Sequence, residues 1–163
     1  MLTLLGMLAS GEAVFDRHKS HLTAHPEVLP LLVGALLTIE SRDREYIQEE
    51  IDFGRIIGSS IRVETGPDDE IIFAQRPGRE GLSRFVKNRK ETPCSTMAVV
   101  LRKGTEDHRA YILMTAFVGI LAPPEPWDKN ADERSVPFWN SNALVWDTSS
   151  IIIPGTETTK SPW

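Results

Sequence analysis

The feature that most constrains the fold is a change in hydrophobic period within the first third of the chain. From Val28 to Ile39 the chain is apolar on nearly every side, which is typical of a helix buried at the centre of a domain. Thr23 can cap this helix, and Pro26 and Pro30 fit its first turn, where a missing N–H costs little. From Tyr46 onward apolar and polar residues alternate, as in strands with one face in water. This order predicts an α+β fold in which N-terminal helices pack on a predominantly antiparallel β-sheet.

Two hairpins are predicted within that sheet. Ile57–Thr65 and Glu70–Gln75 are rich in strand-forming residues and flank a Gly-Pro-Asp-Asp turn signal. Thr96–Arg102 and Ala110–Val118 flank a polar connection that contains a glycine. Hairpin connections between neighbouring strands favour an antiparallel arrangement.

The length of the chain, 163 residues, is typical of one domain. We expect residues 1–153 to form a single α+β domain, with a helical part at about 1–41 and a sheet part at about 45–147. Within the helical part, a first helix is expected between Leu2 and Leu22. Residues 154–163 are rich in Thr, Ser and Pro, and are predicted to form a flexible tail.

Cysteine content and charge indicate the compartment. Cys94 is the only cysteine, so no intramolecular disulfide can form, which favours a cytoplasmic location. The apolar start, Met1 to Leu8, lacks a basic region and is too short to cross a bilayer, so neither a signal peptide nor membrane association is expected. The net charge of -5 argues against a uniformly basic surface but leaves room for a local positive patch.

Positive charge gathers between residues 76 and 90. Phosphate binding requires such clustering because each neutralised phosphate releases counterions; a solvated loop is the alternative explanation. Arg84 lies between Ser83 and Phe85 in a β-like stretch, where a held guanidinium can grip a phosphate with two hydrogen bonds. The other cationic candidates for RNA binding are Arg76, Arg79, Lys87, Arg89 and Lys90.

The strand Ala110–Val118 offers further candidates. Strict alternation predicts that Tyr111, Leu113, Thr115 and Phe117 share the open face, opposite the helix-packed core. There Thr115 can supply a hydroxyl to a phosphate, while Tyr111 and Phe117 can stack on bases. Ordinary strand preference explains the same three residue types and remains an alternative.

Glu64 shares a strand face with Arg62. Metal-free RNA cleavage needs a group that takes the 2′-hydroxyl proton, cations that stabilise the phosphorane, and a proton donor for the leaving oxygen. If the face of Glu64 is the open one, this carboxylate can act as the general base near Arg84. A surface salt bridge between Arg62 and Glu64 is the competing interpretation.

Histidine gives little support to metal chemistry. His18, His21 and His25 have spacings that place them on one side of a helix, but no acidic partner stands at a recognisable spacing, so we expect surface positions and no metal or cofactor. The sequence contains no zinc-protease, P-loop, dinucleotide-binding or esterase motif.

The stretch from Phe53 to Asp147 resembles a family of small uncharacterised bacterial proteins. The shared motifs are G-R-x-x-G-x-S, R-x-G-R-x-G-x-S-R-F-V from Arg76 to Val86, and T-A-F-V-G from Thr115 to Gly119. The later segments A-P-P-E-P-W-D and F-W-x-x-x-A-L-V-W also match, and the stretch that these motifs span covers more than half of the chain.

The order of helices and sheet, the basic residues mid-sheet and the T-A-F strand are also similar to the barnase/EndoU/colicin D/RelE-like nucleases. This resemblance implies a metal-independent endoribonuclease of toxin type, with RNA and an antitoxin or immunity protein as partners. It assigns Arg84 to phosphate contact and Thr115 to the hydroxyl position, with Arg79 and Lys87 nearby. The family segment F-W-x-x-H-A-L-V carries a histidine where this chain has Asn142, so whether the chain is an active enzyme stays open.

The alternative function is a non-catalytic binding module. Such a module would bind a protein partner through Pro123–Trp127 and two tryptophans, Trp139 and Trp146, since prolines and tryptophans are good interface anchors. The same basic residues would equally permit RNA binding without cleavage.

Overall fold

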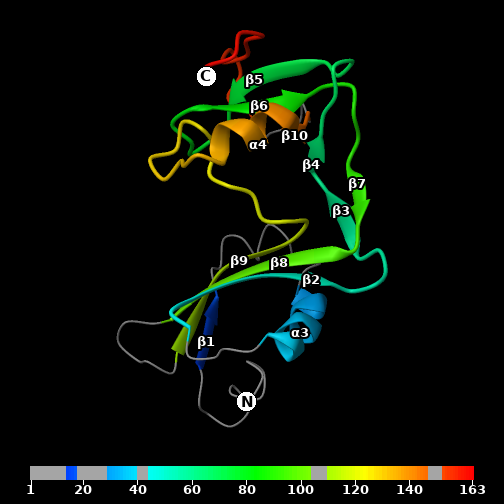
Figure 1. The fold of residues 1–163 in the computed structure, drawn as a ribbon, viewed down its shortest axis with the longest axis vertical. Helices are drawn as coiled ribbons and strands as arrows, with labels where there is room; N and C mark the ends of the chain where they lie inside the picture. The colour runs from blue at the N-terminus through cyan, green and yellow to red at the C-terminus, as the bar shows by residue number, and fades with distance from the viewer. Residues whose placement is uncertain (1–13, 18–28, 40–43, 104–109, 147–151) are drawn as a thin grey trace. The chain divides into compact units, whose positions relative to one another are not determined.

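A computed structural model describes residues 14–17, 29–39, 44–103, 110–146 and 152–163 of the chain. These residues form a mixed α+β structure with mostly antiparallel sheets and few helices (Figure 1). Where the sequence predicts a single domain, contacts group the chain into two compact units. Unit 1 comprises residues 1–58 and 94–121, and unit 2 comprises residues 59–93 and 122–163. Each unit has its own sheet and its own apolar core.

Unit 1 contains a four-stranded sheet with the order β1-β9-β8-β2. Its strands are β1 (Val14–Arg17), β2 (Tyr46–Asp52), β8 (Thr96–Lys103) and β9 (Ala110–Val118). β8 and β9 are the antiparallel pair that the sequence predicts, and β2 is antiparallel to β8. β1 pairs with β9 in parallel, so residues 14–17 are a strand and not part of the first helix predicted from Leu2 to Leu22. The rest of that predicted helix lies outside the described residues.

The buried helix that the apolar run predicts is α3 (Leu29–Thr38). Leu32, Ala35 and Leu36 project from it into the core of unit 1, where they meet Ile47 of β2 and Leu101 of β8. Each large apolar side chain buried in this way stabilises the fold by about 1.5–3 kcal/mol. Within the described ranges, no helix has the length and apolar character that crossing a membrane requires.

A β-bulge in β9 decides which way Tyr111 faces. The register with β8 shifts so that Leu101 pairs with Leu113, and Met114 is left as an extra residue. An extra residue reverses the alternation of the side chains beyond it. Tyr111 therefore lies in the core together with Ala116, and only 2% of it is exposed. The predicted open-face position of Tyr111 is wrong because the bulge breaks strict alternation.

Unit 2 contains a second four-stranded sheet with the order β4-β10-β6-β5. Its strands are β4 (Arg62–Glu64), β5 (Ile71–Gln75), β6 (Leu82–Val86) and β10 (Asn142–Val145). β5 pairs with β6, while β4 pairs with β10, so the predicted hairpin between Ile57–Thr65 and Glu70–Gln75 is wrong. β10 takes the place between β4 and β6, and this long-range pairing has no local turn signal.

A third sheet has two strands. It pairs β3 (Gly58–Ser60) with β7 (Thr92–Cys94). β3 is thus the first part of the β-rich stretch that was predicted as one strand, and Ile61 separates it from β4.

The two faces of the unit 2 sheet differ in what they carry. Phe85 and Leu144 are paired neighbours on one face, and α4 (Ser135–Ser141) packs against them through Trp139. We call this the helix face. By alternation, Arg84 points to the opposite face, which we call the arginine face. A smaller apolar cluster on the arginine face consists of Val63, Val86 and Ala143.

Residues 152–163 lie along β5, although the sequence predicts a flexible tail from residue 154. Phe73 and Thr158 exchange two backbone hydrogen bonds of 2.8 Å. Trp163 packs edge-on against Phe73, with 5.2 Å between the ring centroids. The end of the chain therefore satisfies backbone groups that an edge strand would otherwise leave unpaired.

Gly81 allows Trp127 to approach the connection between β5 and β6. A Cβ added at Gly81 would lie 2.1 Å from Trp127 Cγ and 2.4 Å from Trp127 Cβ, which is far inside van der Waals contact. The requirement at this position is therefore space for the indole, which glycine provides because it has no Cβ.

We predict that Gly81→Ala lowers the free energy of unfolding by about 1–3 kcal/mol, because the new methyl group overpacks the contact with Trp127. Gly66→Ala is the matched control, since a Cβ at Gly66 meets no atom within 4 Å. Urea unfolding of both variants measures the difference, and equal losses would show that space beside Trp127 is not what Gly81 provides.

Candidate functional site

Arg84 is the central residue of the candidate site. It lies in β6 on the arginine face, directly across from Phe73 of β5. Its Nη1 donates one hydrogen bond to Thr65 Oγ1 at 2.8 Å and another to the backbone oxygen of Asn142 at 3.1 Å. Thr65 follows the end of β4 and Asn142 begins β10, so the strand order of unit 2 creates this contact. Both bonds hold the guanidinium against the sheet through one nitrogen.

The charge of Arg84 has no salt-bridge partner within the part of the chain that the structure describes. The side chain is half-buried, and this burial lowers the pKa of the guanidinium from its ordinary value, while the negative charge of Asp69 opposes the shift. An arginine remains protonated at any physiological pH. A fixed cation with neutral hydrogen-bond partners suits an anion such as phosphate, whose oxygens match the guanidinium fork.

The loop that follows β6 is bonded to the turn before β5. Asp69 Oδ2 accepts a hydrogen bond from Arg89 Nη1 at 3.1 Å, and Glu70 N donates to Asn88 Oδ1 at 3.0 Å. These bonds order the basic loop beside Arg84. They also neutralise one of its cations, because Arg89 and Asp69 form an ion pair.

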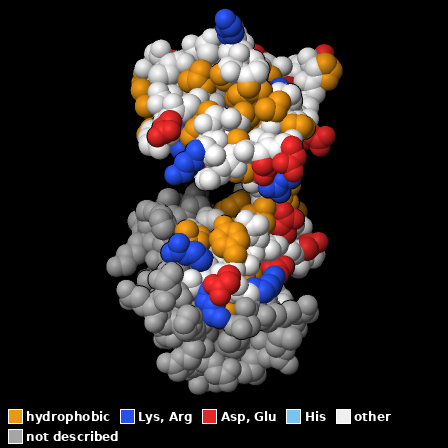
Figure 2. Space-filling model, turned by 60° about the vertical axis from the view of Figure 1, so that its left-hand side comes forward, with side chains coloured by type: hydrophobic (Ala, Val, Ile, Leu, Met, Phe, Trp, Pro, Cys, Tyr) orange, Lys and Arg blue, Asp and Glu red, His pale blue; other side chains and the backbone are white. Residues whose placement is uncertain are grey.

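The remaining cations of the predicted basic cluster do not form one patch. Lys87 Nζ lies 4.0 Å from Glu70 Oε1 and 5.4 Å from the centre of the Trp146 ring. Arg79 and Lys90 are exposed, and neither forms a salt bridge with any described residue. On the face drawn in Figure 2, Lys and Arg side chains stand singly among Asp and Glu side chains. The positive charge thus follows the β5–β6 hairpin as a discontinuous strip.

Arg76 is engaged in an internal ion pair. Its Nη2 donates to Glu125 Oε2 at 2.6 Å, and its Nε donates to Ser83 Oγ at 2.9 Å. Both partners are buried, Glu125 with 8% exposed and Ser83 with none. This guanidinium therefore stabilises unit 2 and is poorly placed to bind RNA.

Three of the segments that carry the predicted family resemblance meet within unit 2. Arg76 and Glu125 join the R-x-G-R-x-G and A-P-P-E-P-W-D segments, as do Gly81 and Trp127. Trp139 of the F-W segment donates its indole hydrogen bond to the Pro123 oxygen at 3.1 Å. These motifs are close in space although they are distant in sequence, and their contacts account for them as parts of one core.

Glu64 and Asn142 belong to the helix face. They pair directly with each other across β4 and β10. The adjacent pair, Val63 and Ala143, lies on the arginine face, so Glu64 and Asn142 point to the opposite face. Asn142 Nδ2 donates to the Phe138 oxygen at 3.0 Å, so its side chain caps the last turn of α4. The structure thus brings the backbone of Asn142 to Arg84 but directs its amide, and the carboxylate of Glu64, to the other face.

Thr115, Tyr111 and Phe117 lie on β9 in unit 1, whereas the site around Arg84 consists of unit 2 residues alone. Thr115 and Phe117 are half-buried. Tyr111 is buried, and its hydroxyl donates to the Arg44 oxygen at 3.2 Å. Tyr111 is therefore a core residue and offers no exposed ring to a base.

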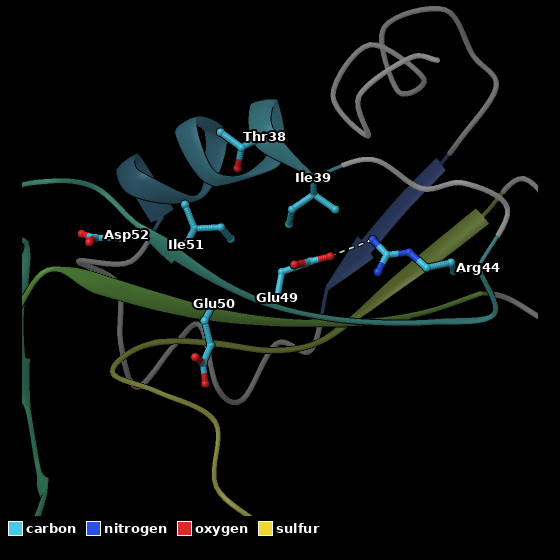
Figure 3. Close-up of a pocket in the computed structure, with 7 residues that line it drawn as sticks. All are labelled: Thr38, Ile39, Arg44, Glu49, Glu50, Ile51 and Asp52. Carbon is cyan, nitrogen blue, oxygen red and sulfur yellow. Dashed lines mark hydrogen bonds and ion pairs between the residues drawn. The ribbon is translucent and has the colours of Figure 1, made fainter.

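A cavity of about 590 Å³ lies in unit 1 beside α3 and β2 (Figure 3). Glu49 forms an ion pair with Arg44 at 2.8 Å, while Glu50 points to the other side of β2 and accepts a hydrogen bond from Leu121 N at 2.8 Å. The two carboxylates do not converge, so the cavity presents no common point for a cation. Its lining consists of Thr38, Ile39, Arg44, Glu49, Glu50, Ile51 and Asp52.

Among the described residues, no group of three His, Cys, Asp or Glu side chains is arranged to hold a metal ion. The histidines stand outside those residues, and so does the predicted alignment of His18, His21 and His25. Cys94 is a half-buried free thiol.

Three residues around the site were not singled out from the sequence. Thr65 precedes the Gly-Pro-Asp-Asp turn and Asp69 is its last residue, but the contact of Thr65 with Arg84 depends on β10 lying between β4 and β6. Glu125 had a clearer signal, because it is the one carboxylate inside the proline-rich A-P-P-E-P-W segment.

No protein-family model, curated protein or solved structure matches this chain. The family resemblance and the likeness to toxin-type nucleases therefore stay predictions. The chemistry of the site rests on the geometry of Arg84 and its neighbours.

We predict that Arg76→Met lowers the free energy of unfolding by about 3 kcal/mol, because it leaves the Glu125 carboxylate buried without its partner. The double variant Arg76→Met/Glu125→Gln should recover part of that loss, since no unpaired charge remains. Urea unfolding of the wild type, both single variants and the double variant measures the coupling. Strictly additive losses would contradict a buried, mutually dependent pair.

Proposed function

We propose that unit 2 binds RNA and that Arg84 holds a backbone phosphate on the arginine face. The observation that carries the proposal is the state of the Arg84 guanidinium. It is half-buried and fixed through Nη1 by Thr65 and by the Asn142 oxygen, and it has no carboxylate partner within the described residues. The other N–H groups of the guanidinium can donate hydrogen bonds to phosphate oxygens.

The surroundings of Arg84 favour a polyanion over an isolated anion. Arg79 is exposed in the connection between β5 and β6, and Lys90 is exposed in the segment that follows β6, so further cationic side chains flank Arg84 along the chain. The chain as a whole carries a net charge of -5, so an RNA strand would be attracted to this strip and repelled elsewhere. Affinity would therefore fall with added salt, as expected when phosphates release their counterions.

Cleavage by a metal-independent, toxin-type endoribonuclease is the second candidate. Arg84 and the likeness to barnase/EndoU/colicin D/RelE-like enzymes support it, and an antitoxin or immunity protein would be its partner. Cleavage also needs a proton acceptor and a proton donor beside the phosphate. Glu64 and Asn142 point to the face opposite Arg84, and the amide of Asn142 is bonded to the Phe138 oxygen. Binding without cleavage is therefore better supported.

A protein partner held by the proline- and tryptophan-rich segments has less support. Only 4% of Trp139 is exposed, and Glu125 inside the proline-rich segment is paired with Arg76. Trp146 is half-buried against Phe85, with 5.5 Å between ring centroids. These side chains serve the core of unit 2 and are poorly exposed as interface anchors.

We predict that Arg84→Ala weakens the binding of labelled single-stranded oligouridine by about tenfold or more, because one charge-assisted phosphate contact is worth about 1.5–3 kcal/mol. The slope of log affinity against log salt should become shallower by about 0.7, the value for one phosphate of a single strand. Fluorescence anisotropy across a salt series measures both quantities.

Arg102→Ala is the matched control for this experiment, because Arg102 is exposed in unit 1 and its loss changes the net charge equally. Arg84→Lys keeps the charge but removes the fork, and should bind with intermediate affinity. Equal affinities for the wild type, Arg84→Ala and Arg102→Ala would refute a phosphate site at Arg84.

We further predict that the wild-type protein binds but does not cleave total RNA in EDTA, since Glu64 and the Asn142 amide point to the face opposite Arg84. Gel analysis of RNA incubated with the wild type and with Arg84→Ala checks this. EDTA-resistant cleavage that disappears in Arg84→Ala would favour the ribonuclease candidate instead.

A further inference from the structure

Asp69 is the carboxylate associated most directly with the arginine face. Its Oδ2 accepts hydrogen bonds from Gly66 N at 2.8 Å and from Arg89 Nη1 at 3.1 Å. Only 9% of its side chain is exposed. Gly66 directly follows Thr65, the residue whose hydroxyl accepts the hydrogen bond of Arg84. The turn from Thr65 to Glu70 therefore holds the Asp69 carboxylate against Arg89 and close to the hydroxyl that binds Arg84.

The carboxylate oxygen of Asp69 is held in the way that an oxygen of a bound ligand would be held. An anionic oxygen held by a guanidinium and a backbone N–H is also the arrangement by which proteins bind phosphate. A bound phosphate near Arg84 would experience repulsion from Asp69 and would compete with it for Arg89.

We propose that Asp69 is an internal competitor that limits how tightly the Arg84 site holds an RNA phosphate. This inference rests on the proposed function of unit 2. When the charge of Asp69 is removed, Arg89 becomes available as a second phosphate ligand and the repulsion toward phosphate at Arg84 disappears. Asp69 then sets the affinity of the site without touching the RNA.

The substitution that tests this idea preserves the turn. In Asp69→Asn, the side-chain oxygen can still accept the hydrogen bond from Gly66 N, while the ion pair with Arg89 is lost. Asp69→Ser provides a second variant, because a hydroxyl oxygen can accept the same bond. Thermal unfolding of both variants verifies that the turn and the sheet remain folded.

Asp68→Asn is a closely matched control. Asp68 is the preceding residue, is exposed, and forms no salt bridge with any described residue. Its substitution changes the net charge by the same amount, so any general effect of charge on RNA attraction appears in both variants. The difference between Asp69→Asn and Asp68→Asn isolates the role of the position.

The experiment measures oligouridine affinity by fluorescence anisotropy for the wild type, Asp69→Asn, Asp69→Ser and Asp68→Asn, and for Arg84→Ala with and without Asp69→Asn. We expect both Asp69 variants to bind about five- to tenfold more tightly than the wild type, and Asp68→Asn to change affinity by less than about twofold, as expected for an exposed charge. In the Arg84→Ala background, the gain from Asp69→Asn should be much smaller.

The outcomes separate this inference from the function on which it rests. If Arg84→Ala weakens binding but folded Asp69 variants match Asp68→Asn, the phosphate site stands and the role of Asp69 is overturned. If the gain from Asp69→Asn is as large in the Arg84→Ala background, Asp69 acts elsewhere and the inference also fails. If the wild type and Arg84→Ala bind RNA equally, the proposed function fails and the inference fails with it.

Discussion

The position of β10 between β4 and β6 is the constraint on which unit 2 depends. This strand has four residues, yet it is antiparallel to β4 on one side and parallel to β6 on the other. It brings the Asn142 oxygen to Arg84, and it places Ala143 and Leu144 in apolar clusters on opposite faces. Without β10, the end of β4 would have no reason to approach β6, and Thr65 would not hold the guanidinium.

Three arginines from one basic run illustrate how neighbours decide the role of a charge. Arg76 is bonded to the buried Glu125, and Arg89 is bonded to Asp69. Arg84 is held by a hydroxyl and a backbone oxygen, both neutral. A paired guanidinium has less to offer a phosphate, because its charge is already compensated by a carboxylate. The neutral partners of Arg84 fix its position while leaving its charge available.

The parts of the fold that were predicted correctly depend on local periodicity. The apolar run became α3, and the alternating stretches became β2, β8 and β9 with the expected antiparallel pairing. The errors have long-range or irregular causes. Strict alternation predicts Tyr111 on the open face, because one extra residue in β9 leaves no recognisable mark in the sequence. β4 and β5 were assigned to a hairpin because the turn signal between them was real, whereas the competing strand lay far along the chain.

The sequence by itself determined the buried helix α3, the strands β2, β8 and β9, the run of positive charge between residues 76 and 90, and the place of Arg84 within a strand. Those properties arise from side-chain periodicity and composition, which act over a few neighbouring residues. Only the tertiary structure decided which cations are paired, and that Glu64 and the Asn142 amide face away from Arg84. Arg84 and Asn142 are 58 positions apart, and their contact depends on strand order and register. A shift of one residue in that register would send each side chain to the opposite face, so the site exists only when the whole sheet has formed.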